Sequence, residues 1–192
     1  MPDPSPQALE FLLTRRSRPA KTLAGPAPDP ETLRTILTAG LRVPDHGKLE
    51  PWELLVIEGP VPARLADLAR RMGRDRGLDP AKADKAALMF QDAPLIVAVV
   101  SHPVESEKVP PVEQTLSAGA VCLSLVNAAL ASGWGANWLT GWTALDKGFL
   151  HEGLGLEPPA FVAGYVVIGT ETSAPPERPR PDLSVRVRRI GA

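Results

Sequence analysis

Residues 94–101 read PLIVAVVS, an apolar run without a charged side chain that fixes the centre of the predicted fold. Such a run is typical of a strand that is buried on both of its faces. Residues 161–169, FVAGYVVIG, form a second run of the same kind. Two shorter β-rich runs, at 52–58 and 136–139, complete a set of four predicted strands.

Helical patterns separate these strands. Asp29-Pro30-Glu31 supplies an N-cap, a first-turn proline and an acidic residue, which together mark the start of a helix. Strands separated by helices favour an α+β or α/β fold. Because no stretch resembles a linker, we expect one domain over residues 1–192, with an extended tail from about residue 171. The predicted helices cover residues 6–15, 29–42, 62–78, 80–91, 112–132 and 144–152.

The helix predicted over 112–132 is apolar on almost every side. Ser117-Ala118-Gly119-Ala120 places small residues within one turn, and few polar side chains follow. A helix of this kind is buried all round. In a chain of 192 residues, that burial requires a second layer of structure or a partner subunit. A core helix and a dimer-interface helix are therefore both open.

Composition excludes several classes of protein. The net charge is −1 at pH 7, so no overall field attracts nucleic acid or an anionic membrane. Glu113 and other polar residues interrupt the most apolar run, 112–133, so no membrane span is expected. The single cysteine, Cys122, argues against disulfides, and the spacing of the three histidines argues against a zinc centre. The N-terminus lacks the basic region of a signal peptide, so we expect a cytoplasmic protein.

Three segments combine residue types that suit a bound ligand. Arg15-Arg16-Ser17-Arg18 offers guanidinium groups that can bind a phosphate bidentately, or it is a solvated basic helix end. The loop at 43–52, VPDHGKLEPW, is either a functional loop that presents its histidine or a rigid connector. Residues 133–142, GWGANWLTGW, suit close approach of the backbone to a flat ligand, or they form a helix cap and an aromatic-rich strand.

In this order, the three segments together resemble the FMN-dependent nitroreductase family. The family loop commonly reads APSxGNxQPW, and Pro44, Gly47, Pro51 and Trp52 keep its frame. The resemblance covers residues 5–170. Within the family, the sequence is most similar to a compact subgroup of NAD(P)H nitroreductases. Further matching segments are Ala93-Pro94, Ser117-Ala118-Gly119-Ala120, Gly133-x-Gly135 and Ile168-Gly169-Thr170.

The resemblance implies a homodimer with an α+β sandwich fold. In that fold, helices flank a mixed sheet and FMN lies at the subunit interface. For His46, the alternative to an FMN contact is an exposed loop residue without a role in binding. The implied FMN contacts are Arg15, Arg16 and Ser17 at the phosphate and ribityl chain, Arg42 and His46 from the partner subunit, and Trp138, Leu139 and Thr140 along the isoalloxazine ring.

The resemblance also implies a reaction without a protein nucleophile, so no catalytic residue and no metal ligand is assigned. No GxGxxG motif follows a predicted strand, which argues against a separate dinucleotide site. NAD(P)H would pass a hydride to N5 of FMN, and a small flat acceptor, nitroaromatic or quinone-like, would then bind in ping-pong order. The same fold also suits flavin destruction or dehalogenation, with residues 60–91 as a lid, or an FMN-binding role without turnover.

The sequence departs from the family pattern at charged positions. Asp45, Lys48 and Glu50 stand where the family loop has Ser, Asn and Gln, so the hydrogen bonding of this loop differs. Pro19 stands where many members have a cation, and the candidates for the flavin pyrimidine edge are Arg16, Arg18 and Lys21. Near the C-terminus, the basic residues available to a phosphate are Arg178, Arg180, Arg186, Arg188 and Arg189.

Overall fold

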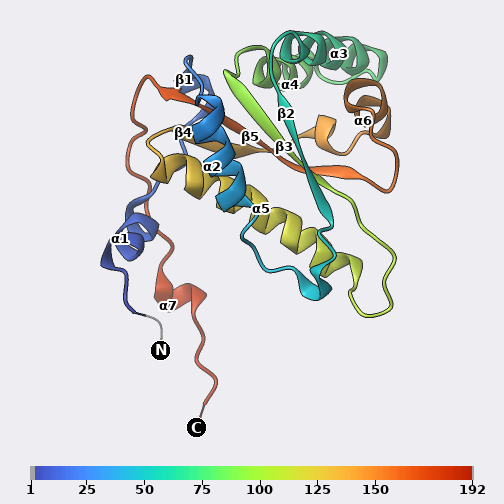
Figure 1. The fold of residues 1–192 in the computed structure, drawn as a ribbon. Coiled ribbons are helices and arrows are strands. Elements are labelled where there is room, and N and C mark those ends of the chain that lie inside the picture. The colour runs from blue at the N-terminus through green and yellow to red at the C-terminus, as the bar shows by residue number, and fades with distance from the viewer. Residues whose placement is uncertain (1–2, 192) are drawn as a thin grey trace.

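The computed structural model describes residues 3–191 and places a five-stranded sheet between two layers of helices (Figure 1). Helices α2 (Pro30–Gly40) and α5 (Pro111–Ala131) cover one face of the sheet. Helices α3 (Val61–Asp75), α4 (Pro80–Gln91) and α6 (Lys147–Leu154) cover the other face. The fold class is α+β, as the sequence predicted.

The sheet has the order β1 (Leu23–Ala24), β5 (Phe161–Glu171), β3 (Leu95–Ser101) and β2 (Trp52–Ile57), and β4 (Gly135–Leu139) also pairs with β5. Every strand pair within residues 3–191 is antiparallel, so the expectation of a mixed sheet is wrong. The helix pair α3 and α4 explains the β2–β3 pairing. It returns the chain to the end of the sheet where β2 stopped, and β3 therefore runs back along β2.

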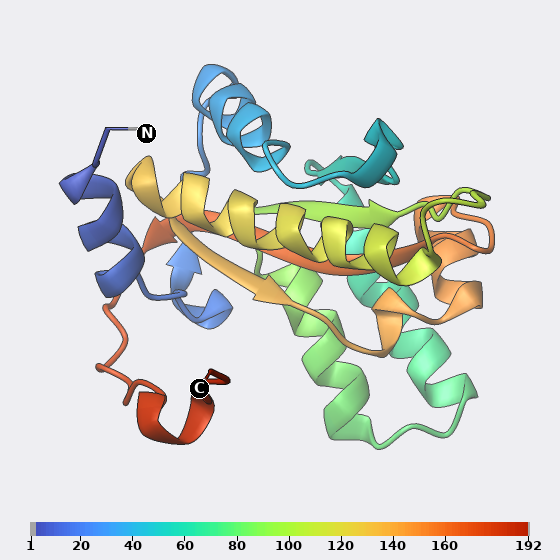
Figure 2. The same cartoon turned by 90° about the horizontal axis from the view of Figure 1, so that it is seen from below.

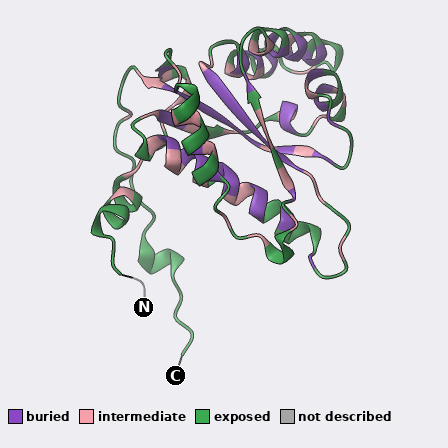
Figure 3. Ribbon diagram, in the orientation of Figure 1, coloured by how far each residue is buried: buried purple, intermediate pink, exposed green. Residues whose placement is uncertain are grey.

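Strand β3, which forms from the apolar run at residues 94–101, lies at the centre of the core. Alternate residues from Leu95 to Val99 pack with α2 and α5, and alternate residues from Ile96 to Val100 pack with α3, α4 and α6. All of these side chains are buried. Figure 3 shows the burial concentrated in this strand and its neighbours. Burial on both faces is the physical reason for a continuous apolar run in place of an alternating one.

Most helix ends follow the predicted signals, and α6 does not. The Asp29 carboxylate accepts two backbone N–H groups at 2.9 Å and caps α2. Gly133 has a φ of 83° directly after the end of α5, as its predicted C′ position requires. Helix α6 ends at Leu154, with Gly155 as its C-cap at a φ of 69°, and so runs past the predicted end at residue 152. Gly153 is a packing residue, because a Cβ there would lie 2.9 Å from Leu65 Cδ2.

Helix α5 is buried on one side only. Its inner side, which includes Val121 and Leu125, packs on the sheet and on α2, as a core helix does. Its outer side exposes Val112, Leu116 and Leu123 by 61%, 68% and 46%. The helix is long and apolar enough to cross a membrane by length and composition. In this fold the helix lies along the sheet. Packing on the sheet and on α2 accounts for the apolar side chains of its inner side, whereas the apolar side chains of its outer side are exposed.

The two chain ends extend together from one side of the molecule (Figures 1 and 2). Helix α1 (Pro6–Thr14) and the short α7 (Leu183–Arg186) contain no buried residue. One link between the two ends is the Arg16 Nη2 group, which donates to the Pro176 carbonyl at 3.0 Å. Neither α7 nor β1 was among the predicted elements.

Candidate functional site

Both chain ends contribute to a pocket of about 840 Å³ that is rich in arginine. The segment after α1 supplies Arg15, Arg16 and Ser17, which are three of the predicted site residues. Strand β4 supplies Asn137. Apart from Pro19, the tail supplies the rest of the lining, including Arg178, Arg180, Asp182 and Arg186.

The pocket holds more positive charge than its own side chains neutralise. Burial, and then the charges of Arg180 and Arg16, hold the pKa of the Arg15 guanidinium below its ordinary value. Within residues 3–191, the Nε atoms of Arg15 and Arg16 are buried without a hydrogen-bond partner. The Asp182 carboxylate instead caps α7 by accepting from the backbone and hydroxyl of Ser184, both at 2.8 Å. A phosphate group fits this pocket, because it supplies the missing charge and several acceptors.

The arginine segment is docked on strand β4. The backbone N–H of Arg18 donates to the Ala136 carbonyl at 2.9 Å, and Asn137 Nδ2 donates to the Arg18 carbonyl at 2.8 Å. The Arg18 side chain points elsewhere and pairs with Glu171, with Nε 3.3 Å from Oε1. This pairing reduces its availability as the cation beside a ligand.

A second pocket, of about 590 Å³, lies further along the same two segments. Leu139 lines it, on the same face of β4 as Asn137, because side chains alternate along a strand. Lys21 lines it from the segment that follows Arg18. Helix α4 closes the opposite side with residues that include Leu88 and Met89. A flat ring with an attached phosphate could therefore follow residues 15–21 from one pocket to the other.

The other two predicted residues of this segment, Trp138 in β4 and Thr140 directly after it, face away from these two pockets. Trp138 and Thr140 line an apolar groove of about 820 Å³ against the outer side of α5. Trp138 is fixed there, because its Nε1 donates to the Ala163 carbonyl at 3.2 Å. The predicted trio 138–140 is thus divided, with Leu139 at the arginine side and its neighbours at the groove.

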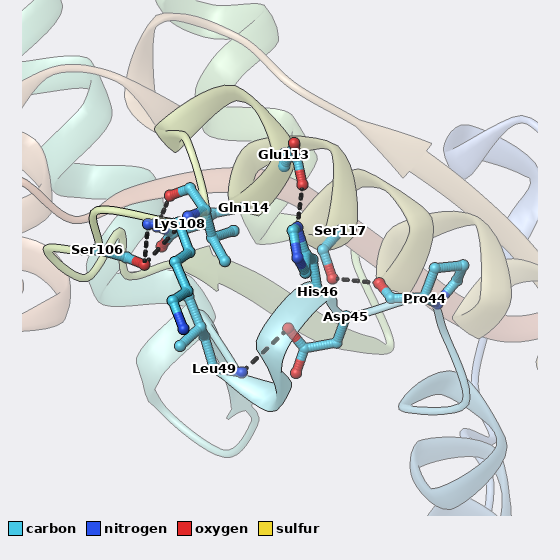
Figure 4. Close-up of polar contacts among 10 residues, drawn as sticks. Pro44, Asp45, His46, Leu49, Ser106, Lys108, Glu113, Gln114 and Ser117 are labelled. Atoms are coloured by element: carbon cyan, nitrogen blue, oxygen red, sulfur yellow. Dashed lines mark hydrogen bonds and ion pairs between the residues drawn. The ribbon is translucent and has the colours of Figure 1, made fainter.

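Arg42 and His46 lie apart from the arginine pocket in the single chain. Arg42 is exposed just after α2 and lines a shallow hollow with Arg34 and Thr38. His46 lies in a 3-10 turn over the start of α5, and its Nδ1 is 2.7 Å from Glu113 Oε2 (Figure 4). Neither residue lines the pocket of Arg15.

The structure brings in residues that local sequence patterns did not place. Arg178, Arg180 and Arg186 were visible as basic tail residues, but no spacing linked them to residues 15–17. Glu113 was noted only as an interruption of an apolar helix. Cys122 is buried in α5, and burial raises the pKa of its thiol to about 12.

Comparison with known proteins decides the family. The sequence signature of the nitroreductase family matches residues 12–170. Putative NAD(P)H nitroreductase YdjA of Escherichia coli is 38% identical over 163 residues, which cover 85% of this chain and 87% of that protein. The chain belongs to the nitroreductase family. A Haemophilus influenzae nitroreductase-family relative, named Putative NAD(P)H nitroreductase, is 36% identical over 165 residues, with coverage of 85% and 88%.

Solved structures of nitroreductase-family proteins share this fold. A nitroreductase-like protein from Bacillus cereus superposes with a TM-score of 0.80 at 21% identity, covering 99% of this chain and 98% of that one. An FMN-dependent nitroreductase from Clostridium difficile gives 0.69 at 19% identity, covering 95% and 98%. The family expected from the sequence is confirmed, and it makes this nitroreductase-family chain an oxidoreductase.

Proposed function

We propose that the protein is a cytoplasmic FMN-dependent NAD(P)H oxidoreductase that reduces nitroaromatic or quinone-like acceptors. The observation that carries the proposal is the arginine pocket, where, within residues 3–191, Arg15, Arg16 and three tail arginines stand against a single lining carboxylate, that of Asp182. The printed names of relatives support it, because they include NAD(P)H nitroreductases and an FMN-dependent nitroreductase.

In this proposal, the two pockets hold different parts of FMN. The guanidinium groups of Arg15 and Arg180 and the hydroxyl of Ser17 bind the phosphate. Leu139 and the apolar side chains of α4 line the space for the ring and exclude water from it. Bound FMN supplies hydride transfer from NAD(P)H to the acceptor, in ping-pong order.

Lys21 is the cation that we assign to the ring. Its side chain lines the ring pocket, whereas Arg18 pairs with Glu171. Arg16 lies in the phosphate pocket, where it also holds the tail through Pro176. A positive charge beside the ring stabilises a negative charge that develops on it, so Lys21 favours reduction.

We further propose that the active form is a homodimer. The outer side of α5, together with Trp138 and Leu145, forms an apolar groove that the single chain leaves exposed. Removing such an apolar patch from contact with water is favourable, and a second copy of the chain can cover it. The dimer would bring Arg42 and His46 of one subunit to the flavin of the other, as the resemblance implies.

Helix α4 at the ring pocket also favours a second reaction class. It belongs to the 60–91 segment that the sequence analysis named as the stretch long enough for a lid. Flavin destruction or dehalogenation would use the same FMN site under such a lid. Loss of the flavin during turnover would identify flavin destruction, and a dehalogenase would release halide from a halogenated phenol.

The proposal is tested on the purified protein by visible absorbance without oxygen. We expect the flavin band to bleach when NADH or NADPH is added and to recover when nitrofurazone or a quinone follows. If the flavin band bleaches and no acceptor restores it, the protein binds flavin without acting as the proposed enzyme. A colourless protein that takes up no added FMN would overturn the proposal.

A further inference from the structure

The loop that carries His46 is held at several points (Figure 4). The Asp45 carboxylate accepts from the backbone N–H groups of Leu49 at 3.2 Å and Glu50 at 2.8 Å. The Ser117 hydroxyl donates to the Pro44 carbonyl at 2.8 Å. These contacts connect the loop to itself and to α5, so they hold the backbone of His46 in place.

The same loop contains backbone conformations that side chains rarely adopt. Lys48 and Glu50 have φ values of 52° and 46°, and Gly47 lies between His46 and Lys48 with a φ of 73°. Left-handed residues other than glycine cost free energy and persist where the surroundings hold them. Such strain is concentrated at functional sites. The strained backbone is the observation that favours a functional loop over a plain connector.

His46 has a partner on α5 that fixes its ring. Glu113 lies in the first turn of α5, where the helix dipole favours a negative charge. An ionised carboxylate only accepts hydrogen bonds, and its Oε2 is 2.7 Å from His46 Nδ1. The Nδ1 atom therefore carries the proton, and Nε2 is left for another ligand. Buried Gln114, bonded to Val104 and Val109, steadies the same helical turn.

We infer that Glu113 is a positioning residue for the proposed flavin site, acting through the ring of His46. The inference rests on the proposed function. With Nδ1 engaged by Glu113, the ring in its neutral form presents Nε2 as an acceptor, which suits an N–H or hydroxyl donor. FMN offers such donors in the N3–H group of its ring and in its ribityl chain. Glu113 thus selects which kind of hydrogen bond His46 makes to the flavin of the second subunit.

The chain provides a matched control for this pair. His151 Nδ1 is 2.6 Å from Glu157 Oε1, and both side chains are exposed on and after α6. Glu113→Gln and Glu157→Gln therefore remove the same charge from the same kind of pair. The third histidine, His102, pairs through Nε2 with Glu53 at 3.0 Å and gives the opposite ring pattern.

The first measurement is the imidazole nitrogen NMR spectrum of the purified protein. We expect His46 and His151 to carry the proton on Nδ1. Glu113→Gln should shift the His46 pattern towards the Nε2–H form, and Glu157→Gln should leave His46 unchanged. A His46 ring already protonated on Nε2 alone in the wild-type protein would overturn the inference.

The second measurement is the FMN dissociation constant of the same variants. Glu113→Gln should weaken binding about two- to tenfold, the usual contribution of one hydrogen bond, whereas Glu157→Gln should not. In a His46→Ala background, Glu113→Gln should have no further effect. If Glu113→Gln weakens FMN binding as much in the His46→Ala background as in the wild type, or does not weaken it in the wild type, this inference alone is overturned. A wild-type protein that binds no FMN would overturn the proposed function as well.

Discussion

Ser117 joins three parts of the site through one hydroxyl group. It accepts from Trp52 Nε1 at 3.1 Å and donates to the Pro44 carbonyl at 2.8 Å. Ser117→Ala leaves both groups without this partner, so we expect the free energy of unfolding to fall by about 1–3 kcal/mol in a urea titration. Ser132→Ala, at the exposed end of the same helix, should change it by less than about 0.5 kcal/mol. Equal stability of the two variants would show that the Ser117 link contributes nothing.

Cys122 illustrates a residue whose chemistry is suppressed by packing. Burial raises the pKa of its thiol to about 12 from the ordinary 9.0, and no part of its side chain is exposed. The thiolate is the reactive form, so the native protein should resist a disulfide reagent at pH 9, whereas the urea-unfolded protein should react fully. Rapid reaction of the native thiol would contradict the buried position.

Single residues were predictable where the signal is local. Residues 15–17 were a candidate for binding phosphate, with a solvated basic helix end as the alternative, and they line a pocket rich in arginine. The tail arginines could not be placed, because about 160 residues of chain separate Arg16 from its partner Pro176. Residues 138–140 are divided between two faces because successive side chains along a strand point to opposite sides. The contacts that the family resemblance implies do not include this alternation.

At the scale of elements, the contact between α2 and α5 depends on a missing side chain. A Cβ on Gly40 would lie 2.3 Å from Leu125 Cδ2. Gly40→Ala should therefore push the helices apart and lower the free energy of unfolding by about 1–3 kcal/mol. Thr38→Ala, on the exposed face of α2, should change it by less than about 0.5 kcal/mol in the same urea titration. A stabilised Gly40→Ala variant would mean that the helices pack differently.

The helices and long strands were predictable from periodicity and end signals, and the sheet was not. Asp29 and Gly133 mark helix ends by their own chemistry. The antiparallel pairing of β2 and β3 depends on how α3 packs with α4, which no local pattern encodes. Strand β1 escaped notice because it spans only Leu23–Ala24 and exists through pairing with β5.

At the scale of the whole molecule, the exposed side of α5 predicts the oligomeric state. Leu116 is 68% exposed and lies in the apolar groove with Leu123 and Trp138. Leu116→Glu would place an unpaired charge in the proposed interface, which costs several kcal/mol. We expect a dimer for the wild type and a monomer for this variant in sedimentation velocity. Lys82→Glu, at an exposed position of α4, should remain dimeric. A monomeric wild type would contradict the shared site.

The central claim is that the arginine pocket formed by both chain ends binds the phosphate of a flavin. The most direct measurement compares the dissociation constants of FMN and riboflavin, which differ by the phosphate alone. The wild-type protein should bind FMN at least about tenfold more tightly, because hydrogen bonds to a charged group contribute about 1.5–3 kcal/mol each. Arg15→Ala combined with Arg180→Ala should remove most of that preference, and Arg74→Ala, exposed on α3, should keep it. Equal affinity of the wild type for FMN and riboflavin would contradict the account.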